Sequence, residues 1–256
     1  MNIQNDLKYW LSDVADIFDD FKDYVLDVDN IEKRRIFIDN DSDILFVAHL
    51  DTVQTPKFIK RSKKRIYAQG LDDRLGCMTA YELSQELKAD LLLTDHEESI
   101  RSTAEFHTCK DYNWIVEFDR EGNDVVTYDC DSVEFLDELE KYFIVGFGSF
   151  SDIAILSTDA CCFNLGLGHK KSHSKDSYVH LHTYKQQVQR FRQFYTRYKD
   201  TKFIRDAKQY DDYYTGYGHT NIGACDICGF ADGVRIFGHV LCEECLDYMV
   251  DTCKVF

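Results

Sequence analysis

Phe46-Val47-Ala48-His49-Leu50-Asp51-Thr52-Val53 joins an apolar, β-branched run to a histidine and a carboxylate two residues apart. The alternation places the side chains of His49 and Asp51 on the same side of an extended strand end. An imidazole that binds a metal usually donates its free N–H to an acceptor that fixes the ring, and Asp51 is placed for that role. A single His-x-Asp pair is more often a surface or capping pair, so the later motifs decide between the two interpretations.

The composition predicts one main domain with a small additional module. The 256 residues are 44% hydrophobic and 14% aromatic, which is enough to bury one full-sized core. The 46 acidic residues exceed the 30 basic residues, and the formal net charge of -16 repels phosphate backbones and anionic membranes. We therefore expect no membrane binding and no general nucleic-acid binding, and we expect cationic ligands such as metal ions to be favoured.

The cysteines and the amino terminus indicate the cytoplasm. Ten cysteines occur without an apolar signal segment after Met1, a combination typical of reducing compartments where thiols are buried or bound to metal. No apolar run is long enough to span a bilayer. We expect a cytoplasmic protein, in the host cytoplasm if a virus encodes it.

Short apolar strands alternate with helical segments through the first 200 residues. Strands are expected at 36–38, 44–48, 66–68, 90–94, 114–120, 124–128, 144–145 and 161–165. Helices are expected at 7–26 with a break near Asp19, after Gly70, and at 102–109, 133–143 and 184–198. The alternation predicts an α/β domain, a three-layer sandwich with a largely parallel central sheet. The basic segment 57–65 is predicted to be a solvated hairpin.

Acidic residues gather at the ends of these elements. Glu97-Glu98 and Asp119 come at the carboxyl ends of strands, where open α/β sheets place their sites, and Asp72-Asp73 begins the helix after Gly70. A carboxylate has two oxygens and can bridge two metals. The side chains of adjacent residues diverge, so one acid of a pair can bind metal while the other reaches a substrate.

The order His49-x-Asp51, Asp72-Asp73, Glu97-Glu98, Asp119 and His173 resembles the clan of co-catalytic dizinc exopeptidases, which includes zinc aminopeptidases, glutamate carboxypeptidase and the aminoacylases. Three stretches look like family motifs: Ala48-His49-Leu50-Asp51-Thr52-Val53, Leu71-Asp72-Asp73-Arg74-Leu75-Gly76 and His173-Ser174-Lys175-Asp176-Ser177-Tyr178-Val179. Any one motif can arise by chance, whereas the whole set in the family's order favours a relationship.

The chain departs from the family pattern in two respects. Ser99-Ile100-Arg101 follows the paired glutamates, where many relatives have a glycine. Only short segments separate His49 from Asp72 and Asp119 from His173, which leaves no room for the lid or dimerisation domains that several relatives insert. The resemblance is therefore to a compact member of the clan.

The resemblance implies a dinuclear site that hydrolyses amide bonds. Asp72 would bridge two zinc ions or other divalent metals, with His49 and Asp119 completing one site and Glu98 and His173 the other. Imidazole and carboxylate ligands suit zinc, which supports this assignment independently. The implied activity is that of an exopeptidase of the aminopeptidase type acting on a peptide substrate.

The resemblance also implies roles for three residues that are not metal ligands. Glu97 would be the general base of hydrolysis, and Asp51 would orient His49. Asp73 would be joined to Asp72 by a cis peptide bond.

Four other polar residues near the motifs have no assigned family role. Asp152 lies in a segment that loosely resembles a substrate contact of some relatives, and it can equally be a helix cap. His169, His180 and His182 are expected at the surface or behind the metal ligands.

A cysteine pattern marks a separate module at the carboxyl end. Cys225-Asp226-Ile227-Cys228 and Cys242-Glu243-Glu244-Cys245 form a C-x2-C-x13-C-x2-C arrangement, in which each pair can chelate one face of a tetrahedral ion. The segment 229–241 suits a small hairpin. We expect one structural zinc ion in a zinc ribbon-like module, with a disulfide or redox site as the alternative. The predicted domains are 1–200 for the peptidase-like unit, 201–220 for a linker or arm and 221–256 for the module.

Three functions stay open on the sequence. The first is a dizinc peptidase or amidase, and the second is a deacylase of N-acyl amino acids. The third is an inactive peptidase-fold adaptor that binds a protein partner, or a second copy of itself, through the zinc module. The complete set of metal residues together with Glu97 argues against the third, because a decayed enzyme is expected to lose at least one of them.

Overall fold

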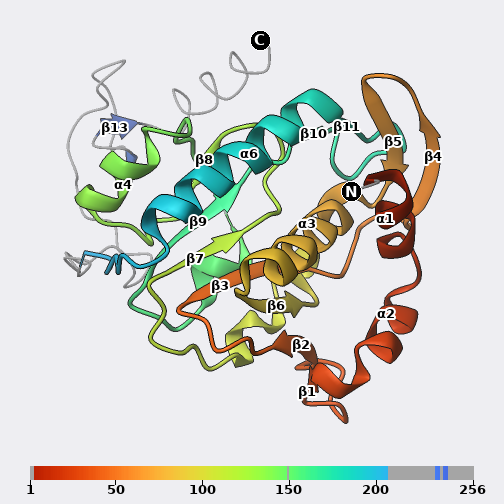
Figure 1. Ribbon diagram of the computed structural model, residues 1–256, viewed down its shortest axis with the longest axis horizontal. Coiled ribbons are helices and arrows are strands. Elements are labelled where there is room, and N and C mark those ends of the chain that lie inside the picture. The colour runs from red at the N-terminus through yellow and green to blue at the C-terminus, as the bar shows by residue number, and fades with distance from the viewer. Residues whose placement is uncertain (1–2, 149, 207–233, 237–238, 242–256) are drawn as a thin grey trace. The chain divides into compact units, whose positions relative to one another are not determined.

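The computed structural model describes residues 3–148, 150–206, 234–236 and 239–241, which Figure 1 draws in colour. The chain divides into two units, Met1–Ala207 and Lys208–Phe256. Among the described residues no helix is both long and apolar enough to cross a membrane. The first unit carries the motifs of the predicted peptidase site.

A seven-stranded sheet forms the centre of the first unit, in the order β1-β2-β6-β3-β7-β9-β8. The neighbours β6, β3, β7 and β9 are parallel, and the remaining pairs are antiparallel. The strands are β1 (Val25–Leu26), β2 (Arg35–Ile38), β3 (Ile44–His49), β6 (Asp90–Thr94), β7 (Trp114–Glu117), β8 (Val125–Val126) and β9 (Cys161–Leu165). The prediction of an α/β fold with a largely parallel central sheet is confirmed.

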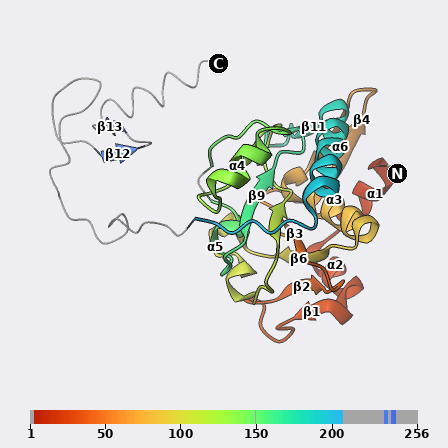
Figure 2. The same cartoon turned by 60° about the vertical axis from the view of Figure 1, so that its left-hand side comes forward.

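The four parallel strands are buried along their whole length, which explains their nearly continuous apolar sequences. One face packs against α3 (Leu71–Leu87) and α6 (Leu181–Tyr198), where Phe191 lies with its ring centroid 5.4 Å from that of Phe46 on β3. The opposite face packs against α5 (Asp152–Ile155), which Figure 2 shows across the sheet from α3 and α6. The 3-10 helix η3 (Thr103–Phe106) lies on the same face as α5, and both contribute to a core with Leu45 and Val47 of β3. Helices therefore cover both faces of the sheet.

A second, four-stranded antiparallel sheet stands beside the helices, in the order β10-β11-β5-β4. Its strands are β4 (Lys57–Arg61), β5 (Arg65–Gln69), β10 (His169–Lys170) and β11 (Tyr178–His180). The basic segment 57–65 forms the β4–β5 hairpin, and β4 is mostly exposed, as the sequence predicted. The connection between β10 and β11 carries His173.

Several helices differ from the sequence prediction. The opening segment is divided into α1 (Ile3–Trp10), α2 (Val14–Asp20) and the 3-10 helix η1 (Lys22–Tyr24). The expected break near Asp19 is confirmed, because α2 ends at Asp20 and η1 begins at Lys22. A further break before Asp13 was not expected, and there the Asp13 carboxylate accepts a hydrogen bond from Ala15 N and caps α2. The expected helix 102–109 is only η3, α4 (Val133–Leu139) is shorter than predicted, and Val145 makes a single bridge to Val125 instead of a strand.

The first unit continues past the long helix α6. Phe203 is buried with its ring centroid 5.0 Å from that of Phe135, and its carbonyl accepts a hydrogen bond from Cys161 N. Residues 201–206 thus pack on the α/β unit. The predicted linker beyond them, up to residue 220, lies outside the described residues.

In the second unit the structure describes β12 (Val234–Ile236) and β13 (His239–Leu241), which pair antiparallel. The two strands lie in the segment between the cysteine pairs for which a hairpin is expected. Cys225, Cys228, Cys242 and Cys245 themselves lie outside the described residues, so their zinc site stays a prediction.

Candidate metal centre

The carboxyl edge of the central sheet brings the predicted site residues together from five parts of the chain. His49 ends β3, Asp119 follows β7, and Asp72 lies in the first turn of α3. Glu97 and Glu98 open the 3-10 helix η2 (Glu97–Ser99) after β6. His173 reaches the same place from the β10–β11 connection.

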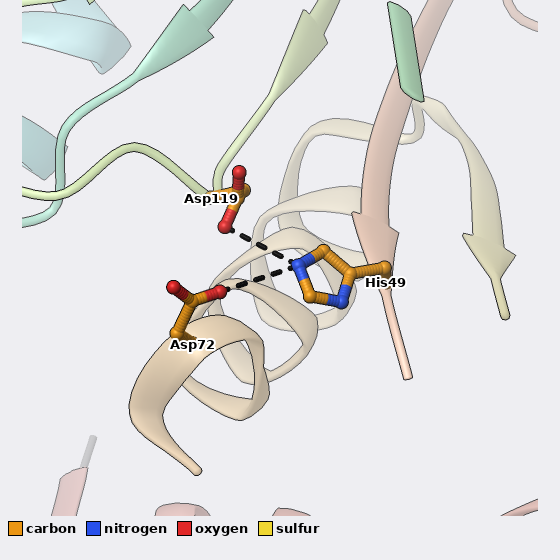
Figure 3. Close-up of side chains that lie close together, drawn as sticks. All are labelled: His49, Asp72 and Asp119. Carbon is orange, nitrogen blue, oxygen red and sulfur yellow. Dashed lines mark ion pairs between the residues drawn. The ribbon is translucent and has the colours of Figure 1, made fainter. Parts of the chain in front are cut away.

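His49, Asp72 and Asp119 form the first group of possible metal ligands (Figure 3). His49 Nε2 lies 3.3 Å from Asp72 Oδ1 and 3.3 Å from Asp119 Oδ1. Two ligand atoms that each lie about 2.0–2.1 Å from a tetrahedral zinc ion are separated by about 3.3 Å. His49 Nε2 is buried and has no hydrogen-bond partner, so a cation between these atoms would satisfy it.

Asp72, Glu98 and His173 form the second group. His173 Nε2 lies 3.2 Å from Asp72 Oδ2 and 2.9 Å from Glu98 Oε2. Asp72 turns Oδ1 towards the first group and Oδ2 towards the second. One carboxylate therefore stands between two sites, as a bridging ligand requires.

Glu97 lies beside the first group and belongs to neither. Its Oε2 is 3.7 Å from His49 Nε2. Burial, reinforced by the negative charge of Asp119 and opposed by His49, raises the pKa of Glu97 to about 8. A carboxyl group with such a pKa can both take up and release a proton near neutral pH.

Asp51 contacts both His49 and the glutamate pair. Its backbone oxygen lies 3.0 Å from His49 Nδ1, and its Oδ1 lies 3.3 Å from the same nitrogen. Its carboxylate also accepts hydrogen bonds from the backbone N–H groups of Glu97 at 3.1 Å and Glu98 at 2.9 Å. The orienting contact to His49 was expected, whereas the fixing of the glutamate turn was not.

Asp73 links the first turn of α3 to the end of β3 through hydrogen bonds of its side chain. The Asp72–Asp73 peptide bond is cis, as the resemblance implied. The fully buried Asp73 carboxylate accepts hydrogen bonds from Gly76 N at 2.9 Å and from His49 N at 3.3 Å. A Cβ at position 76 would lie 2.1 Å from Asp73 Oδ1, so the close approach requires glycine.

Asn164 on β9 is a site residue that sequence reasoning missed. Its Oδ1 accepts hydrogen bonds from the backbone N–H groups of Asp119 at 3.0 Å and Arg120 at 2.8 Å. Its Nδ2 donates to Asp119 Oδ2 at 3.2 Å, leaving Oδ1 of that carboxylate for His49. A polar amide within the apolar run Cys161-Cys162-Phe163-Asn164-Leu165 was the available signal, because a fully buried amide needs partners.

The electrostatics of the site fit divalent cations. Behind the two groups, Glu117 and Asp152 are fully buried, and both oxygens of Glu117 lack hydrogen-bond partners. Burial and the charge of Asp152 raise the pKa of Glu117 well above its ordinary value. Burial and Asp72 likewise raise the pKa of Glu98 to about 7. This concentration of carboxylates, with imidazoles interposed, suits zinc or another divalent ion.

An open cleft of about 440 Å³ exposes the site. It is lined by Asp72, Glu97, Glu98, Asp119, Arg120, Glu121, Tyr128, Phe147, Gly148, Phe150 and His173. Its volume lies in the range of small-molecule sites, about 300–1,000 Å³. Asp72, Asp119, Glu98 and His173 are therefore accessible to a ligand, whereas His49 is fully buried and does not line the cleft.

The structure also places the residues that had no motif role. Asp152 is not a cap: Ser151 occupies the N-cap position of α5, and Asp152 accepts a hydrogen bond from Thr94 Oγ1 in the interior. His169 is fully buried on β10, whereas His182 is exposed. His180 is half-buried on β11.

No family model and no curated protein sequence matches the chain. Solved structures match it by fold. Aminopeptidase PepT from Bacillus cereus ATCC 10987 superposes with a TM-score of 0.55 and 10% identity, over 75% of this chain and 96% of that one. The TET1 peptidase of Pyrococcus horikoshii superposes with a TM-score of 0.52 and 13% identity, over 74% of this chain and 98% of that one. The α/β unit therefore has the fold of these peptidases.

Proposed function

We propose that this protein is a divalent-metal-dependent hydrolase of amide bonds, an exopeptidase of the aminopeptidase type. Two zinc ions would be held, one by His49, Asp72 and Asp119 and the other by Asp72, Glu98 and His173. A third, structural zinc ion would be held by Cys225, Cys228, Cys242 and Cys245. The peptidase fold is consistent with this proposal, but a shared fold alone does not establish an activity.

One observation carries the proposal: two groups of ligand atoms share Asp72, and a buried glutamate stands beside them. The shared carboxylate supports a pair of ions about 3.5–4 Å apart, the spacing of two-metal hydrolytic sites. Glu97 is left free for acid–base work, since it belongs to neither ligand group. A purely structural metal site does not need a carboxyl group that is close to the ion but does not bind it, so the position of Glu97 favours a catalytic site.

The residues divide the work of hydrolysis among them. When bound, the divalent ions polarise the scissile carbonyl and lower the pKa of a water. Glu97 Oε2 accepts a proton from the attacking water and returns it to the leaving amine nitrogen. Asp51 keeps Glu97 in place through the amide hydrogen bond and, by contacting Nδ1, fixes the ring of His49 with Nε2 facing the ion.

Two glutamine substitutions test the proposal, and each serves as the control of the other. Glu97→Gln keeps the shape of the side chain and removes the base, so both ions should stay bound while turnover falls by about 100-fold or more. Glu98→Gln should instead bind one of the two ions more weakly, because Glu98 is a proposed ligand. The measurements are metal content and hydrolysis of a panel of aminoacyl, dipeptide and N-acyl amino acid substrates.

The substrate panel also separates the remaining alternatives. Cleavage of N-acyl amino acids in preference to aminoacyl substrates would replace the aminopeptidase with a deacylase. A wild-type protein that carries both ions, hydrolyses none of the panel and binds a partner as tightly as Glu97→Gln does would be an adaptor, and the hydrolase proposal would fail.

A further inference from the structure

Arg120 is the only lysine or arginine among the described residues that line the cleft. It directly follows Asp119, a proposed ligand, and its side chain is about one quarter exposed (27%). Tyr128 and Phe150 line the same cleft. The cleft beside the two groups of possible metal ligands is therefore lined by one cationic side chain and by aromatic rings.

The guanidinium of Arg120 is held in place before any ligand binds. Its Nε donates to Asp124 Oδ1 at 3.2 Å, and its Nη2 donates to Asp124 Oδ2 at 2.9 Å. A Cβ at Gly146 would lie 2.2 Å from Asp124 Oδ2, so the missing side chain makes room for this pair. Asn164 Oδ1 fixes the Arg120 backbone N–H at 2.8 Å.

Donor groups of Arg120 remain for a ligand. A guanidinium carries five N–H donors in a planar fork, and Asp124 uses two of them, which leaves about three. The fork matches the two oxygens of a carboxylate better than a lysine does. Because the group is already ordered, binding has little side-chain entropy to overcome.

We infer that Arg120 binds a carboxylate of the substrate, close to the amide bond that is cleaved. This inference rests on the proposed function and narrows its substrate class. A cleft of about 440 Å³ holds only a few residues, so the carboxylate belongs to a residue next to the scissile bond. In the loaded site divalent ions would compensate the charges of Asp72, Glu98 and Asp119, which leaves Glu97 and Glu121 as the other carboxyl groups that line the cleft.

The carboxylate has two possible sources. It is either an acidic side chain on the residue before the scissile bond or the free terminal carboxylate of a dipeptide. Comparing kcat/KM for glutamyl p-nitroanilide and glutaminyl p-nitroanilide tests the first source. Comparing kcat/KM for Leu-Ala and Leu-Ala amide tests the second. In each pair the two members differ only by one charge.

We expect metal-loaded wild-type protein to prefer the carboxylate member of one pair by about 10- to 100-fold in kcat/KM, as a charge-assisted hydrogen-bonded pair provides. In Arg120→Met the ratio should fall towards one through a rise in KM for that member, and in Arg120→Lys it should be intermediate. Arg192→Met is the matched control, because Arg192 makes the same two-point contact with Glu86, at 2.9 and 2.6 Å, outside the cleft.

Calorimetric titration of metal-loaded Glu97→Gln, whose turnover is strongly reduced, with L-glutamate and L-glutamine, or with Leu-Ala and its amide, measures the same preference as a difference in affinity. Equal kcat/KM for the wild type and equal affinity for Glu97→Gln within both pairs would overturn the inference and leave the hydrolase intact. A preference that Arg120→Met keeps, or that Arg192→Met loses equally, would also overturn it. Hydrolysis of none of these four substrates and of none of the wider substrate panel would contradict the proposed function itself, and the inference with it.

Discussion

Asn164 shows how a residue outside the metal groups can decide their geometry. By donating to Asp119 Oδ2 and accepting from two backbone N–H groups, it leaves one oxygen of Asp119 facing His49. Such supporting partners are commonly worth about 10- to 100-fold in metal affinity. The carboxamide is therefore expected to act on only one of the two ions.

Asn164→Asp keeps the oxygen that accepts hydrogen bonds from the backbone N–H groups of Asp119 and Arg120. It replaces the amide nitrogen that donates to Asp119 Oδ2 with an oxygen that repels this carboxylate. Titration of metal-free sites with Mn²⁺, which disfavours thiolate ligands, should show one ion bound about 10- to 100-fold more weakly and the other unchanged. Gln187→Glu is the control, because this buried amide donates to Asn123 O and Gly166 O and contacts no proposed ligand. Wild-type Mn²⁺ affinity in Asn164→Asp, or equal loss in both variants, would contradict the role.

The ionisable groups of the site predict the pH dependence of stability without metal. Glu97, Glu98 and His173 have pKa values raised to about 8, 7 and 9 from ordinary values of 4.5, 4.5 and 6.5, the first two mainly by burial and the third mainly by Asp72. The folded state holds these protons more tightly, so its stability falls as pH rises from about 4.5 to about 9. The pKa values of Asp51 and Asp72 are lowered from an ordinary value of 3.8, so these two groups change the stability only below about pH 4.

Divalent ions can replace these protons, so Mn²⁺ should raise the melting temperature more at pH 8 than at pH 6. A tenfold difference in affinity corresponds to about 1.4 kcal/mol and to about 3–6 °C for a unit of this size. Thermal melting with and without Mn²⁺ at the two pH values gives the comparison. An equal increment at both would show that protons and metal ions do not compete for these groups.

At the scale of elements, the first turn of α3 links the sheet to the site. Asp73 accepts hydrogen bonds from Gly76 in the helix and from His49 at the end of β3. Helix propensity alone would favour Gly76→Ala by about 1 kcal/mol. The close approach of Asp73 Oδ1 to position 76 predicts the opposite sign.

Gly76→Ala should lower the free energy of unfolding by about 1–3 kcal/mol, because the new methyl group displaces a buried carboxylate. Urea unfolding measures the change. Gln85→Ala, at an exposed position of the same helix, is the control and should be neutral or slightly stabilising. If Gly76→Ala is as stable as the control, the packing of Asp73 does not constrain this turn.

Local sequence patterns predicted the parallel strands well and the rest of the fold less well. The bounds 90–94 and 161–165 agree with β6 and β9, since continuous apolar runs between polar turns mark buried strands. The pairing of β11 with β5 joins residues more than 100 positions apart, and no local pattern encodes it. The break at Asp13 was missed because the apolar spacing continues across the cap.

The candidate site was predicted in part for the same reason. Polar residues at strand ends stand out against apolar runs, so His49, Glu98 and Asp119 could be named from the sequence. The hydrogen bonds of Asp51 to the glutamate turn and of Asn164 to Asp119 depend on how distant elements meet. Burial of Asp152 and His169 likewise follows from tertiary packing.

At the scale of the whole molecule, the two units are expected to have separate sources of stability. The α/β unit buries its own cores on both faces of the sheet. A small cysteine module depends on its metal, which contributes on the order of 10–16 kcal/mol in zinc-finger peptides. The units should therefore respond differently to loss of a thiolate.

Cys242→Ser should lose one zinc ion per chain and become protease-sensitive beyond about residue 220, while the α/β unit keeps its melting temperature. Elemental analysis measures the zinc content, and limited proteolysis measures the protease sensitivity. Cys161→Ser, at a buried thiol of the α/β unit that contacts Ser132 Oγ, is the control and should leave the zinc content unchanged. Unchanged zinc and protease resistance in Cys242→Ser would remove the support for the module. A loss of hydrolysis would indicate that the module influences the cleft.

Two divalent ions are proposed to share Asp72, and the most direct test is the Mn²⁺ stoichiometry of Asp72→Ala, measured by calorimetry beside wild type. Alanine removes both carboxylate oxygens, so both groups lose a ligand. The wild-type protein should bind two ions in the α/β unit, and Asp72→Ala should bind neither at concentrations that saturate the wild type. Binding of one or both ions by Asp72→Ala with wild-type affinity would contradict the shared site.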